Sequence, residues 1–243
     1  MKPDLLVTDF SGAYEAEGFL PSLREKDVPF RLVSLGDIEG TNCYCTPEAE
    51  AEIRRRIGSE TREKIRWVDS GDYHYMTRIL AGFETEPFTL VLVDNHPDDQ
   101  EPAFGGVLSC GGWVKSMREG NANLGEVWTL GPDHRIRNAS GTVDRVLEEG
   151  IGDLLAALDG HRVYLSVDKD VLCREDSRTD WSQGSYRLSV LKGWMKGLLK
   201  LDVVAVDLCG ELAPSKGATS EDLRINCKTN VDLQDFILDC LKK

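Results

Sequence analysis

The stretch that most constrains the fold is an apolar run, Phe88–Val93, which reads Phe-Thr-Leu-Val-Leu-Val. A run of this length, rich in β-branched and aliphatic residues, is typical of a strand buried on both faces. Such strands occur in parallel sheets that helices cover on both sides. The run therefore favours an α/β fold.

The rest of the chain supports this fold class, because short apolar runs alternate with helical patterns. Further strands are expected at residues 5–8, 31–35, 65–68, 127–130, 163–167 and 203–206. Helices are expected at residues 47–57, 75–82, 113–118, 143–158, 188–199 and 231–241. Strands separated by helices predict βαβ units and a mainly parallel sheet. Since no repeat, linker or composition break interrupts the pattern, residues 1–243 are expected to form a single domain.

Composition narrows the choice of partners. The formal net charge is -13 and the isoelectric point is near 4.8, which argues against nucleic acid or an anionic membrane surface as a partner. No apolar run reaches the length of a membrane span, and the N-terminus has no signal-peptide pattern, so a cytoplasmic location is expected. The seven cysteines have scattered spacings, which predicts reduced thiols and no structural zinc knuckle.

Three ionisable residues follow the buried run at alternate positions: Asp94, His96 and Asp98. Side chains at such spacing in an extended segment point the same way, so the three are expected to converge just beyond the strand. Two carboxylates and an imidazole in a half-buried site need a compensating cation. The motif therefore predicts a divalent metal site.

Two other segments contribute residues of the same kind. Asp168 and Asp170 follow the strand at 163–167 and share one face, and His74 follows a turn that contains Gly71. Because parallel strands end at one edge of a sheet, all three motifs are expected in one crevice. The predicted ligands, enough for two divalent ions, are His74, Asp94, His96, Asp98, Asp168 and Asp170.

The motifs resemble the three metal-binding signatures of the arginase/agmatinase (ureohydrolase) superfamily. They are Gly71-Asp72-Tyr73-His74, Asp94-x-His96-x-Asp98 and Ser166-x-Asp168-x-Asp170. They occur in the family's order, and the resemblance covers residues from about 65 to 215. The first motif differs from the family pattern, because Tyr73 is inserted before His74.

The resemblance implies a three-layer α/β/α domain with a pair of Mn²⁺ ions. By motif position, Asp94 and Asp168 would bridge the ions. His74 and Asp98 would complete one site, and His96 and Asp170 would complete the other. A ligand set dominated by oxygen suits Mn²⁺, although Zn²⁺ or Fe²⁺ could occupy it.

The substrate side differs from the family pattern more strongly. Family members that hydrolyse guanidines carry an acid and an Asn-Pro pair in the late strand, whereas this chain has Glu211 one position late and no Asn. The histidine that family arginases use as a proton shuttle has no counterpart in residues 105–113. The sequence therefore indicates a divergent member with a substrate pocket of its own.

The expected reaction is hydrolysis of a linear C–N bond, of an amidine, guanidine or amide, in a small-molecule substrate. His134 is a candidate proton shuttle, with a surface histidine as the alternative. Glu211 and Asp180 are candidates for contacting a cationic substrate or supporting the metals, with capping or solvation as the alternative. A homo-oligomer is compatible with the sequence.

Other functions remain open at this point. One alternative is a mononuclear zinc deacetylase-like enzyme. The second carboxylate of each motif, Asp98 and Asp170, argues for two ions instead of one. A two-metal phosphoesterase is disfavoured because its Asn-His and Gly-His motifs are missing. A metal-binding scaffold of the same fold would keep the ligands without catalysing a reaction.

Overall fold

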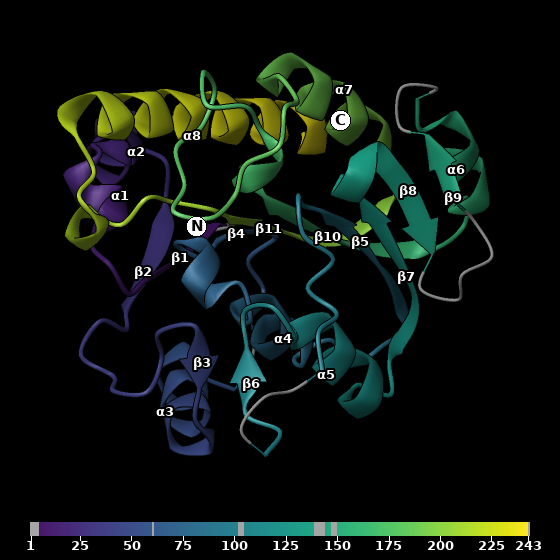
Figure 1. The fold of residues 1–243 in the computed structure, drawn as a ribbon, viewed down its shortest axis with the longest axis horizontal. Coiled ribbons are helices and arrows are strands. Elements are labelled where there is room, and N and C mark those ends of the chain that lie inside the picture. Colours follow the sequence, from purple (N-terminus) through teal and green to yellow (C-terminus); the bar gives the residue numbers. More distant parts are fainter. Residues whose placement is uncertain (1–4, 60, 102–104, 139–143, 147–149, 243) are drawn as a thin grey trace.

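The computed structural model describes residues 5–59, 61–101, 105–138, 144–146 and 150–242. Within these residues a nine-stranded sheet forms the centre of the molecule (Figure 1). Its strands are β1 (Leu5–Asp9), β2 (Phe30–Ser34), β4 (Ile65–Trp67), β5 (Phe88–Val93), β7 (Leu124–Leu130), β8 (Arg135–Asn138), β9 (Asp144–Val146), β10 (Arg162–Asp168) and β11 (Asp202–Cys209). Two further strands, β3 (Tyr44–Cys45) and β6 (Leu108–Ser109), form a separate antiparallel pair.

The strand order is β2-β1-β4-β11-β10-β5-β7-β8-β9. Neighbouring strands from β2 to β7 in this order are parallel. The antiparallel pairs of the sheet are β7 with β8 and β8 with β9. The predicted mainly parallel sheet is therefore confirmed. The order places β10 directly beside β5, although about seventy residues of chain separate them.

Helices cover both faces of the sheet. They are α1 (Ala13–Ala16), α2 (Phe19–Glu25), α3 (Pro47–Ile57), α4 (Met76–Ala81), α5 (Trp113–Gly120), α6 (Gly152–Ala157), α7 (Leu188–Leu198) and α8 (Ser220–Leu241). Figure 1 shows α1, α2, α7 and α8 on one side of the sheet, and α3, α4 and α5 on the other. The three-layer α/β/α architecture expected from the sequence is confirmed.

Strand β5 shows why the chain forms two cores. All six of its residues are buried. Leu90 and Leu92 pack into the core with α3, α4 and α5, whereas Val91 and Val93 pack into the core with α2, α7 and α8. Successive side chains of a strand point to opposite faces, so a continuous apolar run serves both layers.

Two expected elements differ from the structure. A helix was expected over 143–158 with an interruption near Gly150 and Gly152. Helix α6 confirms its second half, whereas the described part of its first half is strand β9. Gly150 adopts a positive φ of 86°, which interrupts a helix, and β9 pairs with β8. The final helix begins at Ser220 rather than at 231. The sequence pattern did not reveal its first half, because the residues buried there, such as Asn226 and Thr229, are polar and show no apolar periodicity.

No helix among the described residues has the length and apolar character to cross a membrane.

The buried carboxylate of Asp69 ties the ends of the first strands together. Its oxygens accept hydrogen bonds from the backbone N–H groups of Phe10 (2.7 Å), Ser11 (2.9 Å) and Ser70 (2.7 Å). The carbonyl of Asp69 also accepts hydrogen bonds from the N–H groups of Gly210 and Glu211, beyond β11. One residue thus joins β1, β4 and β11 at the edge where the motifs lie.

We expect Asp69→Ala to lower the free energy of unfolding by about 3 kcal/mol or more, because three N–H donors that are buried or partly buried lose their acceptor. Chemical denaturation of the variant and the wild type measures the difference. Asp69→Asn is the matched control, since it keeps the shape and one acceptor oxygen and should cost less. A loss below about 0.5 kcal/mol for the alanine variant, the range of ordinary surface changes, would contradict this role.

Candidate metal centre

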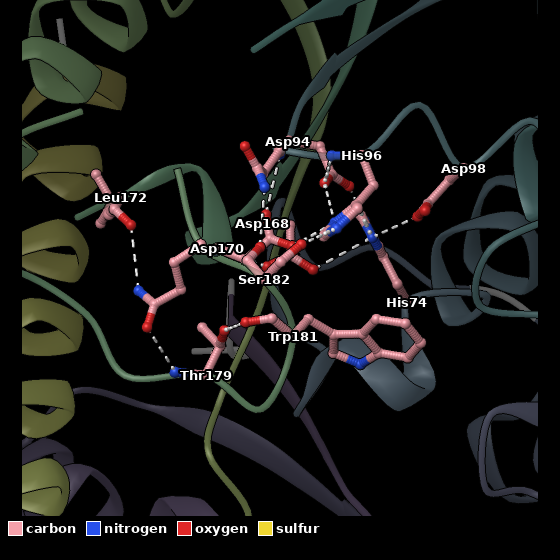
Figure 2. Close-up of polar contacts among 12 residues, drawn as sticks. His74, Asp94, His96, Asp98, Asp168, Asp170, Leu172, Thr179, Trp181 and Ser182 are labelled. Atoms are coloured by element: carbon pink, nitrogen blue, oxygen red, sulfur yellow. Dashed lines mark hydrogen bonds and ion pairs between the residues drawn. The ribbon is translucent and has the colours of Figure 1, made fainter. Parts of the chain in front are cut away.

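The three sequence motifs meet at the carboxyl ends of neighbouring strands. Asp94 follows β5, Asp168 ends β10 and His74 follows the 3-10 turn η1 (Gly71–Tyr73) after β4. All six predicted ligands line one cavity of about 270 Å³. Figure 2 shows their side chains grouped together. The structure therefore brings the whole predicted ligand set to one place.

Three carboxylates surround one imidazole nitrogen. His74 Nδ1 lies 3.0 Å from Asp98 Oδ2, 3.3 Å from Asp94 Oδ2 and 3.4 Å from Asp168 Oδ2. His74 and the three carboxylates are at most 8% exposed. A single ring nitrogen carries at most one proton, so it can donate to only one of these acceptors.

A second group forms around His96. Its Nδ1 lies 2.7 Å from Asp170 Oδ2 and 3.6 Å from Asp94 Oδ1. Asp94 therefore belongs to both groups, with one oxygen toward each imidazole. His96 is partly exposed, whereas the two carboxylates are buried.

Neighbouring side chains fix the orientation of these ligands. His74 Nε2 lies 2.9 Å from Ser166 Oγ, which directs Nδ1 toward the carboxylates. The indole of Trp113 donates from Nε1 to Asp98 Oδ2 at 2.6 Å, and His96 Nε2 lies 2.7 Å from Ser182 Oγ. Such outer contacts are typical of metal-binding histidines and carboxylates.

Burial and mutual repulsion perturb the acids and imidazoles of the cluster. Burial works to raise the pKa of Asp94, but hydrogen bonds with His74 and His96 outweigh it and hold that pKa at about 2. Burial raises the pKa of Asp168 to about 7, and the charge of Asp94 adds to this effect. Hydrogen bonds to Asp170 and Asp94 raise the pKa of His96 to about 11. The buried carboxylates thus compete for positive charge.

The donor set fits a pair of divalent cations. Two groups of three potential ligands, which share Asp94, have all their ligand atoms within 4.8 Å of one another: His74, Asp94 and Asp98, and Asp94, His96 and Asp170. Asp94 Oδ2, although buried, has no hydrogen-bond partner of acceptable geometry. A third such group joins His74 and Asp168 to Cys209, whose thiol also donates to the carbonyl of Ser70. Four carboxylates and two imidazoles provide mainly oxygen donors, with a minority of nitrogen.

The insertion of Tyr73 does not remove His74 from the cluster. Residues 71–73 form the 3-10 turn, and the ring of Tyr73 stacks on Phe10 with a centroid distance of 4.1 Å. The extra residue is therefore directed into an aromatic contact, while His74 reaches the carboxylates.

Glu211 lies in a buried polar cluster beside the cavity and does not line it. Its carboxylate is fully buried and forms an ion pair with the ammonium of Lys169, whose side chain is also fully buried. Asn230 donates from Nδ2 to Glu211 at 2.9 Å and also to Glu17. Lys169 lies between Asp168 and Asp170 in the chain, so its ion pair with Glu211 indicates that Glu211 supports these two ligands. The position of Glu211 does not support a direct role in catalysis.

His134 also lies away from the cavity lining. It is exposed, follows β7, and its Nδ1 lies 2.9 Å from the hydroxyl of Tyr186. The structure therefore does not bring the candidate proton shuttle into contact with the ligand cluster.

Sequence reasoning missed the residues that orient the ligands. Ser166 carries a signal that could have found it, since it lies two positions before Asp168 and shares its face of β10. Ser182 has no comparable signal, because an irregular segment far from the motifs in sequence brings it to His96.

Comparisons with known proteins assign the fold. No family model matches the sequence. An uncharacterized protein of Thermotoga maritima is 29% identical over 214 residues, which span 87% of this chain and 81% of that protein. The structure of formimidoylglutamase from Bacillus subtilis aligns with a TM-score of 0.68 at 15% identity, over 100% of this chain and 88% of that one.

Two other solved structures give the same result. A hypothetical agmatinase from Burkholderia thailandensis aligns with a TM-score of 0.62 at 17% identity, over 96% of this chain and 85% of that one. Arginase from Bacillus caldovelox aligns with a TM-score of 0.61 at 14% identity, over 99% and 98% of the two chains. The chain therefore has the fold of the arginase/agmatinase (ureohydrolase) superfamily, in a divergent sequence. The resemblance inferred from the motifs is confirmed at the level of the fold.

We expect the position of Asp94 in both groups to show in metal stoichiometry. After Mn²⁺ loading and removal of free metal, the wild type should retain about two equivalents, His96→Ala about one, and Asp94→Ala fewer than one. Inductively coupled plasma mass spectrometry gives the metal content per chain. Retention of two equivalents by Asp94→Ala would contradict a shared ligand.

We expect Gly131→Ala to disturb Asp94 through the backbone. Gly131 has a φ of 132°, and a Cβ there would lie 1.9 Å from the carbonyl oxygen of Asp94. The variant should lose at least about 3 kcal/mol of stability and bind Mn²⁺ at least about tenfold more weakly.

Gly160→Ala is the matched control, because Gly160 has a φ of 77° and a Cβ there meets nothing within 4 Å. It should cost about 1 kcal/mol and leave Mn²⁺ affinity unchanged. Thermal unfolding and calorimetric Mn²⁺ titration compare the two variants, and equal behaviour would refute the close-approach argument.

Proposed function

We propose that this protein is a metal-dependent hydrolase of a linear C–N bond in an amidine, guanidine or amide, with two Mn²⁺ ions as its cofactor. The observation that carries the proposal is the pair of ligand groups that share Asp94 at the floor of an open cavity. The names of its structural neighbours, which include arginase, agmatinase and formimidoylglutamase, support the choice of C–N bonds.

Divalent ions held by these residues would lower the pKa of water and polarise the carbon that is attacked. His74 and Asp98 would hold one ion, His96 and Asp170 the other, and Asp94 and Asp168 would contact both. The preference for oxygen donors favours Mn²⁺ over Zn²⁺.

The chain's own residues supply positioning at this site. Gln100 and Ser109 line the cavity without belonging to the ligand set. An amide and a hydroxyl both donate and accept hydrogen bonds, so they can orient either an amide or an amidine. On the side away from the cavity, His74 contacts the hydroxyl of Ser166 and Asp98 accepts from the indole of Trp113, so protein atoms occupy positions that water would otherwise take.

A cysteine-based mechanism receives less support. Cys43 and Cys110 both line the cavity, but burial raises the pKa of Cys43 to about 11 and raises that of Cys110 further. Cys43 donates its thiol proton to Asp72, and the described residues include no imidazole bonded to either sulfur. Neither thiol is therefore activated as a nucleophile.

A screen of guanidino, formimino and acylamino compounds with the Mn²⁺-loaded protein tests the proposal. We expect one of these classes to be hydrolysed, with release of the nitrogen fragment, and His96→Ala to lower kcat/KM by at least about 100-fold. His161→Ala is the matched control, because His161 directly precedes β10 and contacts Thr89 of β5, and neither residue lines the cavity.

Three outcomes separate the alternatives. Hydrolysis that requires both metal equivalents supports the proposal. Full activity on acylamino compounds by the protein with one Zn²⁺ per chain would indicate the mononuclear deacetylase-like enzyme instead. Two bound metals without turnover of any class would indicate a metal-binding scaffold.

A further inference from the structure

Two exposed aromatic side chains stand at the cavity. Among the described residues, the exposed large hydrophobic side chains are Leu32, Tyr44, Trp181 and Val190. The two aromatic ones, Tyr44 at 39% and Trp181 at 40%, both line the cavity that contains the ligand cluster. An exposed aromatic pair at a concave site provides flat apolar surface for a ligand.

Trp181 is held in place and lies beside the ligands. Its Nε1 donates to Asp72 Oδ1 at 3.1 Å, and a Cβ on Gly71 would lie 2.7 Å from Trp181 Cδ1. Its ring meets that of His96 edge to face, with centroids 6.1 Å apart. Figure 2 shows the indole next to the ligand cluster. Trp181 is thus a wall of the cavity beside the ligand His96, held by its hydrogen bond to Asp72.

Contacts from several segments hold Asp72, which anchors this wall. Asp72 is 3% exposed and accepts hydrogen bonds from Asn42 Nδ2 at 2.9 Å and from the thiol of Cys43 at 3.2 Å. Tyr44 follows directly in the chain, and β3 pairs it with Ser109 on the cavity lining. The two aromatic walls are therefore parts of one connected arrangement.

An acidic substrate group would find no lysine or arginine in the cavity lining, in the part of the chain that the structure describes. Lys216 lies near Trp181, but its ammonium is 3.3 Å from Asp72 and 3.5 Å from Asp180, so two carboxylates already neutralise it. A carboxylate held against the two aromatic rings, away from the ligand cluster and its ions, would lose water without gaining a lysine or arginine partner, which is costly.

We propose that the substrate's non-reacting end is a flat, uncharged apolar group that packs between Tyr44 and Trp181, and that it carries no carboxylate. This inference rests on the proposed function, because it assumes that the reacting C–N group lies at the ligand cluster. Trp181 and Tyr44 are then the residues that determine specificity, and Asp72 is the positioning residue for Trp181.

Calorimetric binding to the Mn²⁺-loaded protein tests the proposal with three probes: guanidine, benzylguanidine and 4-carboxybenzylguanidine. Benzylguanidine should bind at least about tenfold more tightly than guanidine, through contact with the two rings. It should also bind at least about tenfold more tightly than its carboxylate derivative. Equal or tighter binding of the carboxylate derivative, or no gain over guanidine, would overturn the proposal.

Variants locate the effect. Trp181→Ala should remove the benzyl advantage and leave guanidine binding within about twofold, whereas Trp181→Phe should keep most of it. Tyr44→Ala provides a second test at the other exposed aromatic residue of the lining, should Trp181→Ala fail to fold. Leu32→Ala is the matched control, because Leu32 is equally exposed outside the cavity, and it should change nothing. An unchanged benzyl advantage in both wall variants would also overturn the proposal.

Turnover separates this inference from the proposed function. Tight benzylguanidine binding that depends on Trp181, without hydrolysis of any C–N compound, would remove the proposed function and leave the aromatic subsite in place. Hydrolysis of carboxylate-bearing compounds in preference to neutral ones would remove the aromatic subsite and leave the hydrolase.

Discussion

The repulsion among four buried carboxylates is the constraint on which the rest of this structure depends. Asp94, Asp98 and Asp168 all direct an oxygen at one imidazole nitrogen, and Asp94 also faces His96. Carboxylates at such distances, away from water, need more positive charge than two imidazoles can give. Divalent cations bound at this cluster would supply it, and that would explain why a folded chain keeps the cluster at the edge of its core.

The sheet topology is what brings the cluster together. Strands β5 and β10 are neighbours, so Asp94 and Asp168 meet at the same edge although they are distant in sequence. Asp69 joins the ends of β1, β4 and β11 close by, and Gly131 allows β7 to pass directly against the backbone of Asp94. The buried ion pair of Lys169 and Glu211 supports β10 between its two ligands. The packing of the strand ends therefore fixes the positions of the ligands.

The sequence predicted the fold class and all six clustered residues, because both depend on local patterns. An apolar run followed by acids at alternate positions predicts both where the buried strand ends and which side chains converge there. Glu211 was a candidate for contacting a cationic substrate or supporting the metals, and His134 was a candidate proton shuttle, but a strand end does not reveal which way the following loop turns. One turns toward Lys169, and the other toward Tyr186.

The aromatic walls lie further beyond sequence reasoning. The sequence left both a pocket wall and core or rim packing open for Trp113 and Trp181, and Trp113 is fully buried. Only the contact between Asp72 and the indole of Trp181, across about a hundred residues, shows that Trp181 faces the cavity. The difference from the family pattern on the substrate side thus has a physical counterpart: aromatic surface is present, and lysine and arginine are missing from the described lining.

The central claim is that these residues hold two metal ions as one unit through Asp94. Electron paramagnetic resonance of the protein with about two equivalents of Mn²⁺ tests it most directly, because ions that share a carboxylate interact magnetically. The account predicts the broadened spectrum of a coupled pair, which Asp94→Ala converts into that of isolated ions. A six-line spectrum of isolated Mn²⁺ in the fully loaded wild type would contradict it.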